Sequence, residues 1–166
     1  MLKDVLTHNL KVVFCGTAKG AKSALSGYYY AGPGNKFYST LFKVGFTPHK
    51  LLPTECYEIN NYGIGLTDLV HTEYGNDNQI SDESYEVDLF IEKMKKFKPE
   101  FIAFTSKKAA SFALGYWGNT KMVNYGLQSS MIGSSKVYIL PSPSGNARKY
   151  WNEDFWHDLN KIIRNS

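Results

Sequence analysis

The sequence predicts an α/β protein in which a central, mostly parallel sheet lies between two layers of helices. Three short runs rich in β-branched and aromatic residues indicate buried strands, at residues 11–15, 101–105 and 136–140. Helical patterns lie between and after these runs, and strands that alternate with helices are typical of parallel sheets. A chain of 166 residues is normally one domain. We therefore expect one α/β/α sandwich domain over residues 1–166.

The clearest helical pattern covers residues 82–98. Its apolar side chains recur at intervals of three and four residues, which places them on one face of a helix. Acidic residues open the segment, lysines close it and Pro99 follows it, as the helix dipole and the geometry of proline favour. Further helices are predicted at residues 37–44, 106–114 and 153–164.

The composition argues against several classes of protein. Two cysteines, Cys15 and Cys56, are too few for a disulfide framework or a cysteine zinc site, and they fit a reducing cytoplasm. The four histidines show no spacing typical of metal ligands, so we predict neither a metal nor a cofactor. No apolar run approaches the roughly 18 residues of a membrane span. The net charge of +4 suits a polyanionic partner without requiring one.

Three loops are the candidates for a functional site, at residues 16–34, 62–77 and 141–149. In α/β proteins of this class, ligands bind beyond the carboxyl ends of the strands, so we expect these loops to meet there. The first loop begins within CGTAKG (residues 15–20) and runs into GYYYAGPGNKFY (residues 27–38). Its glycines permit tight turns, and its tyrosine rings offer faces on which a flat ligand could stack.

Four segments occur in a fixed order along the chain: VVFCGTAKGAKSA (residues 12–24), YYAGPGNKFY (29–38), YGIGLTDLV (62–70) and LPSPSGNAR (140–148). Together they resemble the mismatch-specific uracil-DNA glycosylase and thymine-DNA glycosylase family of the uracil-DNA glycosylase superfamily. The resemblance extends over nearly the whole chain. It implies a uracil-DNA glycosylase-like fold and a monofunctional, metal-free enzyme of base excision repair. Such an enzyme flips uracil, or another damaged or mispaired base, out of DNA and hydrolyses its N-glycosidic bond.

The resemblance also implies a partner and a location. The partner is double-stranded DNA with G·U or related lesions, and the protein is expected to be a monomer that does not bind membranes. It is expected in a bacterial-type cytoplasm, associated with the nucleoid when bound to DNA.

The same resemblance assigns residues to the site. The base pocket would consist of six residues, with the ring of Tyr30 stacking on the flipped base: Gly16, Thr17, Ala18, Gly20, Tyr30 and Asn35. Ser23 would contact a DNA phosphate or the edge of the base, and Lys19 and Lys149 are possible phosphate contacts. A wedge loop would fill the vacated base stack: Ser144, Gly145, Asn146, Ala147 and Arg148. This loop is more polar than the leucine-containing version of some relatives, which predicts weaker intercalation, with Arg148 contacting a phosphate or the unpaired opposite base.

The first loop departs from the family pattern at the position that matters most for catalysis. The best-known members carry Gly-Ile-Asn-Pro-Gly there, and the asparagine positions the attacking water. Here Ala18 takes its place and Lys19 replaces the proline. A carboxylate near the sugar could stabilise the positive charge of the transition state and deprotonate water. We expect Asp68 to be this catalytic residue, with Asp77 and Glu73 as alternatives.

Other interpretations stay open at this level. Asp68 could instead cap a helix or brace a loop. Because Ala18 cannot orient water, the protein could be a reader of mismatched or abasic DNA with little catalysis. Lys19 could form a Schiff base and add strand-cleaving lyase activity. His71 could be structural, could face DNA or could act as a general acid.

Overall fold

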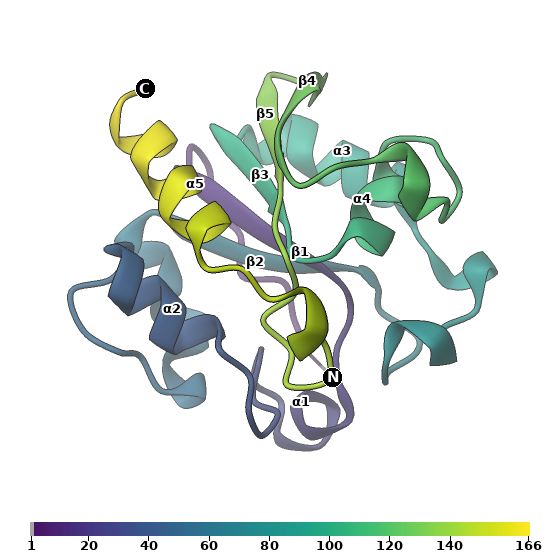
Figure 1. The fold of residues 1–166 in the computed structure, drawn as a ribbon, viewed down its shortest axis with the longest axis horizontal. Helices are drawn as coiled ribbons and strands as arrows, with labels where there is room; N and C mark the ends of the chain where they lie inside the picture. The colour runs from purple at the N-terminus through teal and green to yellow at the C-terminus, as the bar shows by residue number, and fades with distance from the viewer. Residues whose placement is uncertain (1) are drawn as a thin grey trace.

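The computed structural model describes residues 2–166 and confirms the predicted α/β architecture (Figure 1). Its five-stranded sheet has the order β2-β1-β3-β5-β4. The strands are β1 (Val12–Ala18), β2 (Ile64–Val70), β3 (Phe101–Phe104), β4 (Gly126–Ile132) and β5 (Ser135–Ile139). β4 is antiparallel to β5, whereas the other neighbouring strands are parallel. The sheet is therefore mostly parallel.

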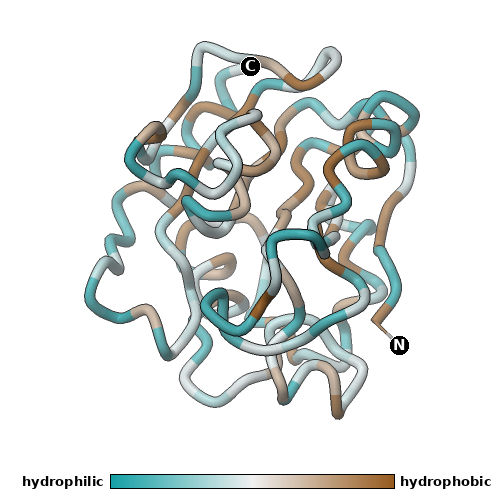
Figure 2. The backbone as a smooth tube through the Cα atoms, turned by 90° about the vertical axis from the view of Figure 1, so that its right-hand side faces the viewer, coloured by the Kyte–Doolittle hydropathy of each residue, from teal (hydrophilic) through white to brown (hydrophobic). Residues whose placement is uncertain are grey.

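Helices cover both faces of the sheet. α2 (Phe37–Val44) and α5 (Asp154–Arg164) pack on one face, and α3 (Val87–Phe97) and α4 (Lys107–Ala113) pack on the other (Figure 1). Successive side chains of a strand point to opposite faces, so Phe14 joins the first core and Val13 joins the second. In Figure 2, the hydrophilic stretches of the backbone tube lie mainly in the outer loops. Among residues 2–166, no helix is both long and apolar enough to span a bilayer.

Short helices fill the connections. α1 (Ala21–Ser26) follows β1 directly, and the remaining turns are 3-10 helices: η1 (Pro53–Tyr62), η2 (Asp77–Gln79), η3 (Asp82–Ser84), η4 (Thr120–Met122) and η5 (Arg148–Tyr150). The predicted helix at residues 37–44 is confirmed at both ends, and the helices predicted at 106–114 and 153–164 are confirmed to within one residue. Ser106 caps α4, because its Oγ accepts a hydrogen bond from Ala109 N–H at 3.1 Å.

The helix predicted at residues 82–98 is wrong over its first turn, because α3 begins only at Val87. The ring of Tyr85 is buried and stacks on Phe112 at 3.7 Å, and Glu86 N–H donates to the carbonyl of Leu69 at 3.0 Å. These contacts hold Tyr85 extended against the end of β2. Tertiary contacts therefore override the local helical pattern.

The loop predicted at residues 62–77 is also wrong in part, because Ile64–Val70 forms strand β2. Gly65, Thr67 and Asp68 interrupt the apolar run and hide the strand signal, yet every residue of β2 is buried. β2 is an edge strand that pairs with β1, and the N-terminal segment covers it through Val5, which bridges to Leu66. The other missed strand, β4, lies at the opposite edge, and most of its residues are exposed.

Candidate active site

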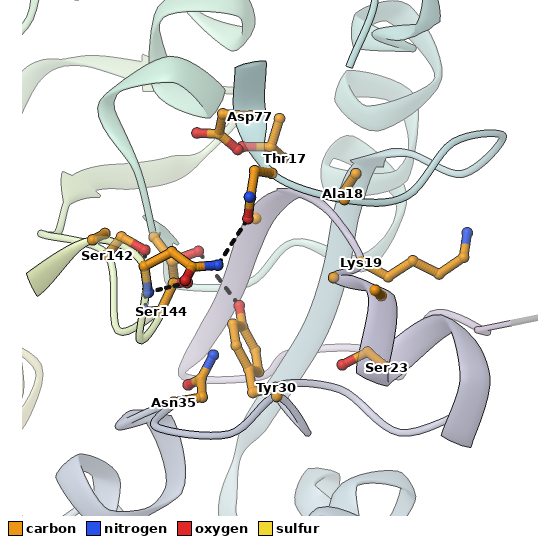
Figure 3. A pocket seen from close by; sticks show the side chains of 18 of the residues that line it. Thr17, Ala18, Lys19, Ser23, Tyr30, Asn35, Asp77, Ser142 and Ser144 are labelled. Atoms are coloured by element: carbon orange, nitrogen blue, oxygen red, sulfur yellow. Dashed lines mark hydrogen bonds between the residues drawn. The ribbon is translucent and has the colours of Figure 1, made fainter. Parts of the chain in front are cut away.

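A cavity of about 690 Å³ opens at the carboxyl ends of β1, β2 and β3. Its walls come from the segments that follow β1, β2 and β5, so the three loops predicted from the sequence do meet at one place (Figure 3). Thr105 and Ser106, which follow β3, also line it. The sequence reasoning missed these two residues, although the rule that ligands bind beyond strand ends applies equally to β3.

Tyr30 forms an aromatic wall of the cavity (Figure 3). Its ring stacks on the buried ring of Phe37, with 3.9 Å between the centroids and 20° between the planes. Its backbone has a φ of 54°, an uncommon conformation for a bulky residue. The turn is held because Ala31 N–H donates to Ser23 Oγ at 3.1 Å. Packing on Phe37 thus fixes one face of the ring and leaves the other face for a ligand.

The floor of the cavity lies beneath the hydroxyl end of Tyr30. There Gly16 of β1 pairs with Asp68 of β2. A Cβ on Gly16 would lie 2.8 Å from Asp68 Oδ1, 3.3 Å from Thr105 Oγ1 and 3.8 Å from the Tyr30 hydroxyl. This crowding requires a glycine at position 16. It also shows that the three polar groups converge on one point.

The carboxyl group of Asp68 has an unusually high pKa. Asp68 is only 7% exposed. Burial is the largest influence and raises the pKa of Asp68 to about 7, with a further increase from Asp4. His71, Lys19 and the Gly16 N–H favour the carboxylate but do not offset the burial. Near neutral pH the group is therefore present in both the neutral and the ionised form.

A second carboxyl group lies at the end of β1. Thr17 points to the opposite face of the sheet from Gly16, and its Oγ1 lies 3.2 Å from Ser106 Oγ. Asp77, at the start of η2, lies beside Thr17 and lines the cavity (Figure 3). Burial raises the pKa of Asp77, while Thr17 and Lys108 lower it. The ammonium of Lys108 donates to the backbone carbonyl of Asp77 at 3.0 Å, which holds η2 in place.

Two other sequence candidates, Glu73 and Lys19, make their side-chain contacts in the loop after β2, although Lys19 also lines the cavity. The carboxylate of Glu73 accepts hydrogen bonds from the N–H and the hydroxyl of Ser81, each at 3.1 Å, and does not line the cavity. The ammonium of Lys19 donates to the carbonyls of His71 and Glu73 at 3.2 and 3.5 Å. Figure 3 shows the Lys19 side chain running away from Tyr30 and Asn35. In this arrangement Lys19 braces the loop after β2.

His71 lies in an ion cluster behind the floor. Its two ring nitrogens lie 3.2 Å from Asp4 Oδ1 and 3.3 Å from Glu86 Oε1. The hydrogen bond with Asp4 is the largest influence, and it raises the pKa of His71. This position agrees with the structural interpretation of the residue.

The predicted wedge loop packs against the segment that contains Asn35. Lys36 N–H donates to the Pro143 carbonyl at 2.8 Å, and a Cβ on Gly145 would lie 2.8 Å from the Pro33 carbonyl oxygen. Asn146 Nδ2 donates to Asn76 Oδ1 at 3.0 Å, so the wedge loop and the η2 loop touch. The remaining wedge residues line the cavity or lie at its rim, with Arg148 and Lys149 exposed.

Three further predicted residues have defined places. Asn35 Oδ1 accepts from Phe37 N–H at 2.9 Å, and its amide nitrogen points into the cavity (Figure 3). Ser23 is buried and its hydroxyl holds the Tyr30 turn, so a contact with DNA phosphate stays a prediction. Gly20 is the residue before α1, and Ala18 places only a methyl group at the end of β1. Within residues 2–166, no group of three or more potential ligands is arranged to hold a metal ion.

Comparison with known proteins agrees with this fold. A model of the uracil DNA glycosylase superfamily matches residues 3–162. The fold is also similar to the solution NMR structure of a Methanosarcina acetivorans protein that is provisionally named a uracil DNA glycosylase. The TM-score is 0.69 at 21% sequence identity, and the alignment covers 98% of this chain and 96% of the other.

Proposed function

Because the chain belongs to the uracil DNA glycosylase superfamily, we propose that it removes uracil from DNA, preferentially from G·U mispairs. It would act as a monomer, with a nucleotide flipped out of the duplex into the cavity and the N-glycosidic bond hydrolysed there. Within the superfamily, this proposal places the protein with the mismatch-specific and thymine-DNA glycosylases. Flipping costs a few kcal/mol and less at a weakened pair, which favours mispaired bases.

The observation that carries this proposal is the aromatic wall above a polar floor. A base inside the cavity can stack on the free face of Tyr30, and base–aromatic stacking contributes about 1–3 kcal/mol. Its edge would then face the Asp68 carboxyl group at the floor, with the amide of Asn35 nearby. A flat ring with hydrogen-bonding groups on its edge fits such a pocket.

Bond cleavage leaves negative charge on the base and positive charge on the sugar, as in glycosyl transfer generally. The cavity offers two carboxyl groups for this chemistry, Asp68 at the floor and Asp77 beside the end of β1. A carboxylate near the sugar stabilises the cation and accepts a proton from water. A neutral carboxyl at the far edge can instead donate a hydrogen bond to the departing base.

DNA would lie across the mouth of the cavity. The wedge loop sits at this mouth, with Arg148 and Lys149 exposed beside it. Lysine and arginine side chains neutralise phosphates and make binding dependent on salt. Asn146, released from Asn76, would be the side chain nearest to the vacated base stack.

The function can be tested with duplexes that carry one altered base each. Excess protein is incubated with uracil, thymine, hypoxanthine, xanthine or ethenocytosine opposite guanine and in single strands, and hot alkali then reveals abasic sites. We expect cleavage at uracil opposite guanine. Tyr30→Ala should slow it about tenfold or more through lost stacking, whereas Tyr116→Ala, outside the cavity, should not. Excess protein that releases no base from any duplex would overturn the proposal.

A second candidate function is suggested by Ala18. Its methyl group cannot hold water, so the protein could bind mispaired or abasic DNA with little catalysis. Tight binding to an abasic duplex in a gel-shift assay, together with no base release from the same panel, would establish this function instead.

A further inference from the structure

The missing water-binding side chain at position 18 leaves a specific question for the proposed glycosylase. Ala18 is the last residue of β1, pairs with Val70 and lines the cavity. Any group that replaces a polar side chain there must lie near the end of β1. It must be able to hold water through a hydrogen bond, and a group that also activates the water must accept a proton from it.

We propose, on the basis of the proposed function, that the Asp77 carboxylate holds and deprotonates the attacking water. Asp77 lies beside Thr17, the residue that directly precedes Ala18, and both carboxylate and hydroxyl belong to the cavity wall (Figure 3). Asp77 therefore lies beside the residue next to Ala18 on β1, whereas Asp68 pairs with Gly16, two residues from Ala18.

The backbone around Asp77 is fixed by contacts from three other segments. Lys108 of α4 donates to the Asp77 carbonyl at 3.0 Å, and Gly75 N–H donates to the Lys19 carbonyl at 2.9 Å. Asn76 accepts from Asn146 of the wedge loop at 3.0 Å. Such fixation is what a water-positioning group requires, because a misplaced reactant costs much of the rate.

Asp68 is less suited to this task because of its depth. The hydroxyl end of Tyr30 lies at the floor, near Gly16 and Thr105. A base stacked on this ring must direct its glycosidic bond to the mouth, since the sugar remains joined to the DNA backbone outside. The far edge of the base then faces Asp68, and the ring of the base lies between the Asp68 carboxyl group and the sugar. The η2 loop, by contrast, touches the wedge loop at the mouth.

The proposed step balances without a cofactor. The bond between C1′ and the base nitrogen breaks, and its electron pair leaves with the base. Water oxygen forms the new bond to C1′, and its proton passes to Asp77. The base anion then takes up a proton from solvent, and Asp77 releases its own.

The test combines three variants in single-turnover excision of uracil opposite guanine. Asp77→Asn should slow the reaction about a hundredfold or more, because the general base is lost. Asp82→Asn is the matched control, since this exposed aspartate starts η3 outside the cavity and should leave the rate unchanged. Adding Ala18→Asn to Asp77→Asn supplies an amide that can hold water at the end of β1, and it should restore part of the lost rate. Gel-shift binding of the uracil duplex should be the same for all variants.

The outcomes separate this inference from the function itself. An Asp77→Asn protein that is as fast as wild type would overturn the inference while leaving the glycosylase function intact. A slow Asp77→Asn protein that Ala18→Asn does not restore, or that binds the duplex poorly, would also overturn it and make Asp77 a structural residue. A wild-type protein that releases no base would instead overturn the function, and the inference with it.

Discussion

Two carboxyl groups lie on β2 or against it, the half-buried Asp4 and the buried Asp68, and their environments differ sharply. Asp4 accepts hydrogen bonds from Thr67 at 2.7 Å and from Lys93 at 2.6 Å, and it lies 3.2 Å from His71. Burial raises its pKa, but the hydrogen bonds from His71, Lys93 and Thr67 outweigh that effect and lower it to about 2. For Asp68, burial prevails and raises the pKa to about 7, although His71, Lys19 and the Gly16 N–H oppose it.

The difference separates a carboxylate with several hydrogen-bond partners from a carboxyl group that is buried with few. Asp4 is ionised and fully paired, and it ties the N-terminal segment to β2 and to Lys93 of α3. Asp68 lost solvent without gaining comparable partners, which costs stability once the group ionises. Groups of this kind concentrate at functional sites, where a ligand supplies the missing partner.

The largest expected effect comes from Asp68→Asn. Since folding raises the pKa of Asp68 from 3.8 to about 7, wild-type stability should decrease as the pH rises through this range, by about 4 kcal/mol in total. The asparagine cannot ionise and escapes this cost. The free energy of unfolding of the variant should therefore exceed that of wild type above pH 7, and urea titrations across the range measure the difference.

The same variant tests the role of Asp68 in the reaction. Ionised Asp68 would repel negative charge on the departing base, so the wild-type single-turnover rate should fall as the pH rises above about 7. The Asp68→Asn rate should not fall. A wild-type rate that instead increases up to pH 7, with a slow variant at every pH, would return the water-handling role to Asp68, as the sequence predicts.

The second-largest expected effect is on stability and concerns Asp4, the carboxylate with several hydrogen-bond partners. Asp4→Asn should lower the free energy of unfolding by about 2 kcal/mol above pH 3.8, because folding lowers the pKa of Asp4 from 3.8 to about 2. The loss should vanish as the pH falls towards 2.

His71 affects stability with the opposite dependence on pH, because folding raises its pKa above the ordinary value of 6.5. Its contribution to stability is complete below pH 6.5 and is lost as the pH rises through the raised pKa.

Thermal unfolding of Asp4→Asn and of the exposed control Glu92→Gln, both on purified protein, measures this effect. The control should unfold at the wild-type temperature, because Glu92 lies on the solvent side of α3. An Asp4→Asn protein as stable as wild type at neutral pH would show that the pairing around Asp4 only offsets its burial.

The contrast between Asp4 and Asp68 also shows what the sequence could reveal. The loops that meet at the cavity follow from the rule for strand ends, and the helices follow from apolar spacing, because both depend on local pattern. The pairing of Asp4 with Lys93 joins residues far apart in sequence, and no local pattern indicates it. No local pattern indicates the burial of Asp68 either, because it depends on the strand pairing that places Asp68 opposite Gly16.

Position 77 shows this limit most clearly. The sequence ranks Asp68 above Asp77 because Asp68 follows an apolar run within a motif. Only the structure shows that β2 extends through Asp68, which buries it, and that η2 returns to place Asp77 beside Thr17. The contacts of the η2 loop with Lys108 and with the wedge loop hold Asp77 in this position. Neither contact could be predicted from the sequence pattern.

The smallest expected effect concerns the lysine near each carboxyl group, Lys93 for Asp4 and Lys19 for Asp68. Lys93 contacts Asp4 directly, whereas the Lys19 ammonium is bound to the carbonyls of His71 and Glu73 and favours ionised Asp68 only through space. Lys19→Met keeps most of the length of the side chain and removes the charge. The pKa of Asp68 should then rise slightly, and the pH at which the excision rate falls should move upwards. The shift should be small because a partly exposed charge is screened.

Single-turnover rates across pH measure this shift, with Lys161→Met on the surface of α5 as the control that should not move it. Borohydride treatment of the wild-type reaction should trap no covalent adduct with DNA, because the Lys19 amine is bound to the backbone carbonyls of His71 and Glu73. A trapped adduct that disappears in Lys19→Met would show that the amine leaves those carbonyls and reacts with the sugar. Lys19 would then be a nucleophile of a bifunctional enzyme, and its long-range influence on Asp68 would be incidental to that chemistry.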